Sequence, residues 1–204
     1  MWYFNIYLIR MKGIITKFRR RDFLKALSGV LFYDVFASPL KTTYSTNMKI
    51  QQYDMQLRPH HIIDIITGHG KNIQYEPHPY GHSQYLVAPR LLSDLDLKIR
   101  LVIGADDICA GCTHLMDDRL CKDVLAQLKP APSKQAYNDL LDSSLFDYFN
   151  LDPNCIISTR EFLILVNDKI PGIEKICTHP KEDPEERLLG LINGLVSLGI
   201  RDAV

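Results

Sequence analysis

Three cysteines fall within one short segment of the chain, and no other feature restricts the local fold as strongly. Cys109 and Cys112 enclose Ala110 and Gly111, and Cys121 follows after a short spacer. For both thiolates of a C-x-x-C pair to reach one metal ion at about 2.3 Å, the backbone must turn between them, and a glycine permits that turn. We therefore expect a loop here, with three thiols available to one site.

Three soft thiolates need one further ligand to complete a tetrahedral zinc site or to hold an iron-sulfur cluster. Cys177 is the predicted fourth ligand, because it follows a helix and a Pro-Gly break and should lie in a loop. Cys155, in another predicted turn, is the second choice. His114 or His179 would instead give a site with three cysteines and one histidine.

Two other uses of these cysteines stay open. An exported protein could oxidise the C-x-x-C pair to a disulfide and join Cys121 to Cys177 in another. A redox-active dithiol is the third possibility. No strand-helix unit brackets the C-x-x-C pair, and the two residues inside it offer no cation that would lower a thiol pKa. The spacing favours a metal or cluster over both alternatives.

The charge balance argues against a nucleic-acid partner. Lysine plus arginine and aspartate plus glutamate both number 24 in the 204 residues. The chain therefore has no net field that would attract nucleic acid over long range. Its length suits one domain with a short appendage.

The first part of the chain, residues 1–45, has the composition of an export leader and linker. Residues 20–25 read Arg-Arg-Asp-Phe-Leu-Lys, which resembles a twin-arginine signal. A moderately apolar stretch follows, and we expect cleavage after Ala37. Asp34 inside that stretch and the apolar residues before Met11 depart from the pattern, so Met11 is the alternative start.

Such a leader directs a chain to the twin-arginine export machinery, which accepts folded proteins with their cofactors in place. We expect a periplasmic or otherwise extracytoplasmic protein. The apolar stretch holds about a dozen residues, and a membrane-spanning helix takes about 20, so no stable membrane span is expected. If residues 21–36 are instead an amphipathic helix packed on the domain, the protein is cytoplasmic.

Apolar periodicity predicts a single small domain over residues 46–204, mainly α (an α-rich α+β fold) with one short sheet. Ser158 and Glu161 form a predicted capping box. Only residues 97–103 alternate with the period of a strand. Helices are expected over 59–67, 83–95 with Pro89 at a kink or start, 118–128, 134–150, 159–169 and 184–198.

His60 and His61 open the first predicted helix. Adjacent helical residues point about 100° apart, so the two rings cannot easily bind one metal ion together. His60 and Asp64 are spaced i, i+4 and could form a carboxylate-histidine pair. Loop histidines are expected to face solvent: His69, His78 and His82. Four residues are expected to lie around the metal ligands and to orient them by hydrogen bonds: His60, His61, Asp106 and Asp107.

Three motifs, in order, resemble an uncharacterised domain family of bacteria and archaea. Its members open with R-x-H-H-L-L, continue through a G-K loop and carry D-D-I-C-x-x-C with a later cysteine. The corresponding residues here are 58–63, 68–71, 104–112 and Cys121. The resemblance covers roughly residues 56–180. Cys177 matches the family's second segment, I-C-x-x-C, which here lacks its last cysteine. The resemblance implies a bound iron-sulfur cluster or zinc.

The sequence thus predicts an exported iron-sulfur protein that works in electron transfer or redox sensing with a protein redox partner. The predicted ligands are Cys109, Cys112, Cys121 and Cys177. The alternative is a structural zinc module that binds another protein without catalysis. A hydrolase built on His60 or His61 with Asp64 lacks any G-x-S-x-G or H-E-x-x-H signature.

We predict that replacing Arg20 and Arg21 together by lysine retains the protein in the cytoplasm. Lysine cannot reproduce the guanidinium fork of arginine, and the leader is a paired-arginine address. Cell fractionation of a C-terminally tagged chain measures the distribution. Undiminished export of the double variant would remove the leader assignment.

Overall fold

The computed structural model describes residues 52–178 and 182–203, so the predicted leader lies outside the described residues. This part of the chain is a small, mainly helical α+β unit, which confirms the predicted fold class. Its helices and strands are β1 Met55–Leu57, α1 Pro59–Gly70, α2 Gln84–Ser93, β2 Lys98–Leu101, η1 Asp107–Cys109, α3 Lys134–Phe149, β3 Ile156–Ser158, α4 Thr159–Asp168, η2 Ile173–Lys175 and α5 Pro184–Ser197.

The sheet has the strand order β1-β2-β3, with β1 and β2 parallel and β2 and β3 antiparallel. A parallel pair needs a crossover connection, and here the chain from β1 to β2 runs through α1 and α2. Leu57 pairs in register with Leu101, and both side chains are fully buried. The sheet therefore fixes the start of α1, two residues after Leu57.

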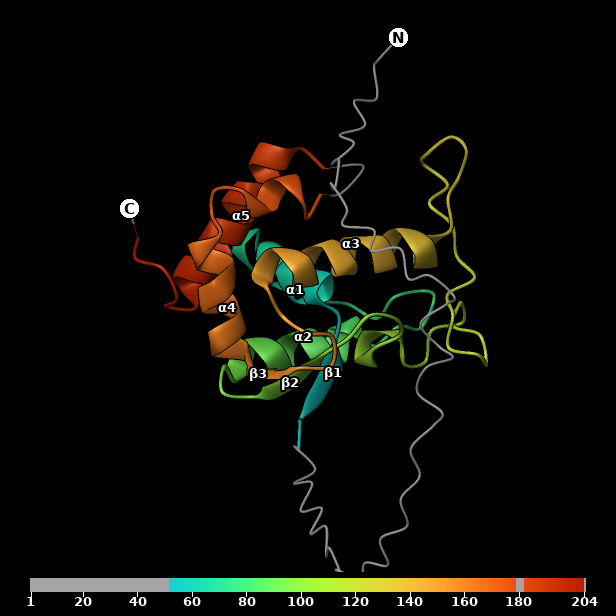
Figure 1. Ribbon diagram of the computed structural model, residues 1–204, viewed down its shortest axis with the longest axis horizontal. Helices are drawn as coiled ribbons and strands as arrows, with labels where there is room; N and C mark the ends of the chain where they lie inside the picture. The colour runs from blue at the N-terminus through green and yellow to red at the C-terminus, as the bar shows by residue number, and fades with distance from the viewer. Residues whose placement is uncertain (1–51, 179–181, 204) are drawn as a thin grey trace, which may run out of the picture. The chain divides into compact units, whose positions relative to one another are not determined.

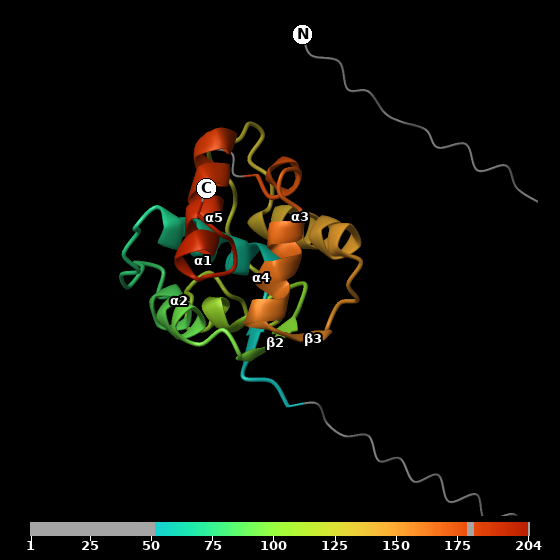
Figure 2. The same ribbon diagram turned by 90° about the vertical axis from the view of Figure 1, so that its left-hand side faces the viewer.

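The helices enclose one apolar core with the sheet. Figures 1 and 2 show α1 in the middle of the molecule, with α3, α4 and α5 around it and the sheet beneath. The isoleucines of α1, at positions 62, 63, 65 and 66, are all buried. A helix that is apolar on so much of its surface must be covered on several sides. None of the described helices is long and apolar enough to cross a bilayer.

Most predicted helices are present with small shifts of their ends, and Ser158 and Glu161 form the predicted capping box. The prediction of a helix over residues 118–128 is wrong. That segment contains only turns and isolated bridges. The side chain of Asp118 accepts from Leu120 N, and Arg119 has a φ of 64°, which is left-handed. Local side-chain hydrogen bonds of this kind compete with helix formation.

Glycines let α1 and α5 pack backbone to backbone, and this is the most extensive contact between two elements of the fold. A Cβ on Gly194 would lie 2.1 Å from the carbonyl oxygen of Ile66. A Cβ on Gly70 would lie 1.9 Å from the carbonyl oxygen of Gly190. Only residues without a side chain can occupy these positions.

We predict that Gly194→Ala lowers the free energy of unfolding by about 2 kcal/mol, the usual cost of overpacking a close contact. The loss should occur although alanine has a helix propensity about 1 kcal/mol better than glycine. Asn193→Ala is the control, because Asn193 is exposed on the same helix. Urea denaturation measures both variants, and equal stability of the two would contradict the packing argument.

Candidate metal centre

A cavity of about 260 Å³ with both polar and apolar lining brings together residues from α1, α3, α5, the loop before α2 and the long connection between β2 and α3. We call it the cysteine cleft. Its possible metal-binding side chains are His60, His61, Asp64, His82, Cys109, Cys112 and Cys121. Three of the four predicted thiol ligands therefore line one cavity, although they come from two different parts of the connection.

The C-x-x-C loop begins at the short helix η1 and is capped by a buried carboxylate. Asp106 Oδ1 accepts hydrogen bonds from Ile108 N at 3.1 Å and Cys109 N at 3.3 Å. Cys112 N donates to Cys109 O at 3.1 Å, which closes the turn between the two cysteines. Asp107 bonds elsewhere, because its Oδ2 accepts from Gln56 N in β1.

A second loop, residues 80–83, lies against the C-x-x-C loop. Ser83 Oγ donates to Ala110 O at 2.7 Å, and Thr113 N donates to Tyr80 O at 2.8 Å. The backbones approach so closely that a Cβ on Gly111 would lie 2.9 Å from the carbonyl oxygen of Gly81. These contacts hold the segment that carries His82 beside the two cysteines.

His82 was expected to face solvent, and this is wrong. The residue is half-buried and lines the cysteine cleft. Its Nδ1 is enclosed and has no hydrogen-bond partner among the described residues. Buried polar atoms are nearly always paired, so a buried ring nitrogen without a partner requires an explanation.

A tight reversal returns Cys121 to the C-x-x-C loop. Met116 N donates to Leu120 O, and Lys122 N donates to His114 O, both at 2.9 Å. These bonds pair Leu115 with Cys121 across an antiparallel bridge. The segment that sequence periodicity assigned to a helix is thus a hairpin-like turn, and that turn carries Cys121 to the cleft.

The three thiols line one cavity but do not form a coordination sphere. In residues 52–178 and 182–203, no three histidine, cysteine or acidic side chains surround a point as metal ligands do. All five cysteines are free thiols. Burial, together with the Asp106 carboxylate, raises the pKa of the Cys109 thiol to about 12. A thiol with this pKa is a poor redox nucleophile at neutral pH, whereas a bound cation displaces its proton.

Cys177 lies apart from the other three predicted ligands. It is 2% exposed and lines a separate, very small cavity of about 10 Å³. Arg187 Nη2 donates to its Sγ at 3.1 Å, and Arg187 Nε donates to its carbonyl oxygen at 2.8 Å. Arg187 also lines the cysteine cleft, so the guanidinium that holds the Cys177 thiol belongs to a residue shared by the two cavities.

Two of the three alternative fourth ligands, Cys155 and His114, are not among the described residues that line the cysteine cleft. Cys155 is half-buried before β3, and the cleft lining does not include it. His114 stacks on Tyr80, with ring centroids 4.1 Å apart, and its Nδ1 lies 3.4 Å from Asp123 Oδ1. His179 lies outside the described residues.

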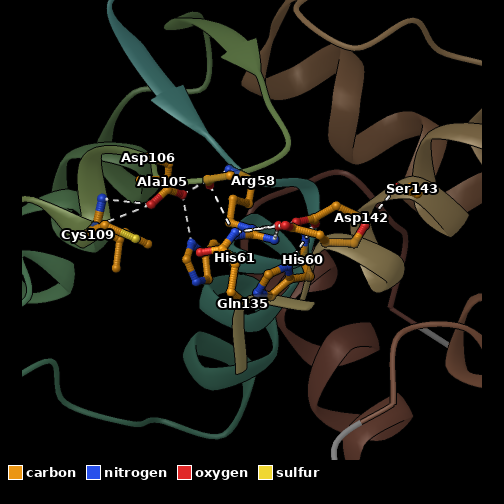
Figure 3. A network of polar contacts seen from close by, with 12 residues as sticks. Arg58, His60, His61, Ala105, Asp106, Cys109, Gln135, Asp142 and Ser143 are labelled. Atoms are coloured by element: carbon orange, nitrogen blue, oxygen red, sulfur yellow. Dashed lines mark hydrogen bonds and ion pairs between the residues drawn. The ribbon is translucent and has the colours of Figure 1, made fainter. Parts of the chain in front are cut away.

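Two histidine-carboxylate pairs form the α1 wall of the cleft (Figure 3). His60 Nδ1 lies 2.7 Å from Asp142 Oδ1, and His61 Nδ1 lies 2.7 Å from Asp106 Oδ2. The His60–Asp64 pair that the i, i+4 spacing suggested is wrong, because Asp64 Oδ1 accepts from Arg187 Nη2 at 2.5 Å. Each histidine therefore takes its carboxylate from a distant segment.

The two rings differ electrostatically although they are neighbours. Burial and the adjacent His61 lower the pKa of His60. Burial also disfavours the charged form of His61, but the Asp106 carboxylate more than offsets this and raises the pKa of His61. Burial likewise opposes ionisation of Asp106, yet the His61 ring holds its pKa at about 2. Asp106 therefore stays ionised at neutral pH.

Arg58 joins the two pairs and had no assigned role in the sequence. Its Nε donates to Asp142 Oδ2 at 2.5 Å, its Nη2 donates to Asp139 Oδ1 at 2.6 Å, and its backbone N donates to Asp106 Oδ2 at 2.9 Å. Nothing in the sequence identified Asp142 or Arg187.

We predict that Asp142→Asn lowers the free energy of unfolding by about 3 kcal/mol, because Arg58 would keep a buried charge with one partner fewer. Asp142 is fully buried, whereas the Asp139 side chain is 36% exposed. Asp139→Asn is therefore the matched control and should cost less than about 1 kcal/mol. Chemical denaturation at neutral pH measures both, and equal losses would show that burial is not the cause.

Comparison of the chain with protein-family models, curated proteins and solved structures gives no match in any of the three. The resemblance of three motifs to an uncharacterised family therefore stays a prediction. Any functional assignment rests on the side chains that line the cysteine cleft and on their chemistry.

Proposed function

We propose that this protein binds a zinc ion through Cys109, Cys112 and Cys121, with His82 as the fourth ligand. The observation that supports this is the lining of one cavity by three thiols and a histidine whose Nδ1 has no partner. Three cysteines and one histidine form one of the common structural zinc sites. The proposal keeps the predicted three-cysteine core and replaces the predicted fourth ligand.

The residues present fit such an ion. The Nδ1 of His82 has no described hydrogen-bond partner, and coordination to a metal ion would satisfy it. The cavity of about 260 Å³ is far larger than one ion needs, so the thiols can approach without displacing core residues. Cys109, Cys112 and Cys121 all lie in segments with little regular secondary structure, where small backbone adjustments are inexpensive.

Bound zinc would supply a cross-link between the C-x-x-C loop, the turn that carries Cys121 and the loop that carries His82. In small metal-binding domains, the free energy of binding is also free energy of folding. We propose that the ion orders this side of the cleft and that the ordered surface binds another protein.

An iron-sulfur cluster on Cys109, Cys112, Cys121 and Cys177 is the second candidate function, with electron transfer to a protein partner after export. Its support is the short spacing of the first three cysteines. The Arg187 guanidinium argues against it, because Cys177 could reach the cleft only if Arg187 gave up its hydrogen bond to the thiol. Export itself depends on the leader, which lies outside the described residues.

We predict that the full chain, purified anaerobically from cytoplasm, contains a zinc ion bound by Cys109, Cys112, Cys121 and His82 and no acid-labile sulfide. Cys109→Ser, Cys112→Ser, Cys121→Ser and His82→Gln should each lose that ion and lower the melting temperature, because each removes one ligand. Cys155→Ser is the matched control and should keep it. Metal analysis by mass spectrometry and thermal denaturation are the measurements.

Cys177→Ser distinguishes the two candidates. A zinc site completed by His82 predicts that this variant keeps its metal. Iron, labile sulfide and a visible absorption band that disappear in Cys177→Ser would replace zinc by the iron-sulfur cluster. Full metal occupancy in a variant that lacks both Cys109 and Cys112 would end both proposals.

A further inference from the structure

We propose that His60 and His61 form a second cation site, on the α1 wall of the cysteine cleft, for a borderline divalent ion such as Zn²⁺, Co²⁺ or Ni²⁺. Asp64 would supply the third donor. The site goes beyond the cysteine-bound ion and does not depend on it, because no cysteine is among its ligands. It also assigns ligand roles to two histidines that the sequence suggested would only support a metal site.

The first support is the orientation of the two rings. A carboxylate can only accept a hydrogen bond, so the Nδ1 atoms of His60 and His61 donate to Asp142 and Asp106. In its neutral form, each imidazole then has a free lone pair on Nε2. The Asp106 carboxylate favours the protonated form of His61, so a cation that binds there must displace the Nε2 proton. Neither Nε2 has a hydrogen-bond partner in the described part of the chain, and both residues line the cleft.

The second support is that this arrangement is how proteins prepare histidines to bind metals. Metal-ligating histidines almost always donate their other ring N-H to a carboxylate or carbonyl, which fixes the ring and raises its basicity. Here both carboxylates are buried, and both are held by Arg58, through its backbone N on Asp106 and its Nε on Asp142. The charge on Arg58 is compensated by Asp142 and Asp139, so it does not leave a free cation behind the rings.

The third support is the position of the rings and of Asp64. Adjacent residues on a helix should diverge by about 100°, yet the ring centroids of His60 and His61 lie 4.4 Å apart. The two rings therefore lie side by side, each held by its own carboxylate. Asp64 follows one turn later on α1 and lines the same cavity. Two imidazoles and one carboxylate form a known donor set for divalent ions.

Asp64 would have to change partner when an ion binds. It now accepts from Arg187 Nη2 at 2.5 Å, and among the described side chains no three donors yet form a coordination sphere. Asp64 is 37% exposed, so rotation of its side chain meets little resistance from packing. Arg187 keeps Glu182 and the Cys177 carbonyl oxygen as partners after such a rotation.

The experiment titrates the full chain with Co²⁺ alone, using calorimetry for stoichiometry and absorption for ligand type. Wild-type protein should bind two ions, and only one should give the charge-transfer band of a thiolate-cobalt bond. The triple variant Cys109→Ser, Cys112→Ser, Cys121→Ser should keep one ion without that band. His61→Gln should weaken the ion that lacks the band at least ten-fold, while His69→Gln, at the far end of α1, should leave it unchanged.

Each alternative result has a definite meaning. A single ion that gives the thiolate band in wild-type protein, or a band-free ion of unchanged affinity after His61→Gln, would overturn the histidine site. If the triple variant does not fold, the weaker binding of the band-free ion in the otherwise wild-type His61→Gln chain still tests it. Absence of the thiolate band in wild-type protein would refute the cysteine centre alone and leave the histidine site standing.

Discussion

The two buried carboxylates that bind the histidines of α1 are the interactions on which the rest of the site depends. Asp106 accepts from the Arg58 backbone and the His61 ring, and it also caps the loop that carries Cys109. Asp142 accepts from the side chain of Arg58 and from both the backbone and the ring of His60. Three segments that are distant in sequence therefore meet at the junction of β1 and α1. Loss of either carboxylate would separate the cleft walls.

The close packing of α1 on α5 makes this junction rigid. Because glycines bring the helix backbones together, α1 cannot slide or tilt without a clash at Gly70 or Gly194. Arg187 extends from α5 to Asp64 on α1 and so continues the same contact into the cleft. The apolar core thus fixes the position of α1, and the carboxylates then fix the orientation of the histidines at its start.

The parts of the fold that depend on local chemistry could be predicted from the sequence. The capping box at Ser158, Pro59 in the first turn of α1 and the apolar periodicity all act within a few residues, and they give the helices almost their true ends. The helix predicted over 118–128 is absent because the periodicity of this segment resembles that of a helix, whereas Asp118 and the left-handed Arg119 form turns. Apolar periodicity alone does not reveal that local side-chain hydrogen bonds compete with the helix.

The candidate site could be predicted only in part, for the same reason. The cysteines are recognised by spacing, which is a local signal, and three of them do line one cavity. The partners of His60, His61 and Asp64 come from segments more than forty residues away, so helical spacing assigned His60 and Asp64 to each other incorrectly. Cys177 lies in a bend as expected, but burial against Arg187 separates it from the cleft, and burial depends on tertiary packing.

The two walls of the cysteine cleft are stabilised by different interactions, and this difference affects how the cleft could bind cations. The histidine wall belongs to a packed helix and is fixed by ionised, hydrogen-bonded carboxylates. The cysteine wall belongs to residues 102–133, where the only named element is the three-residue η1. Loops of this length are uncommon inside compact domains and are usually either functional or poorly ordered. A cation bound by the thiols would supply that order, and it would do so beside imidazoles that are already oriented without it.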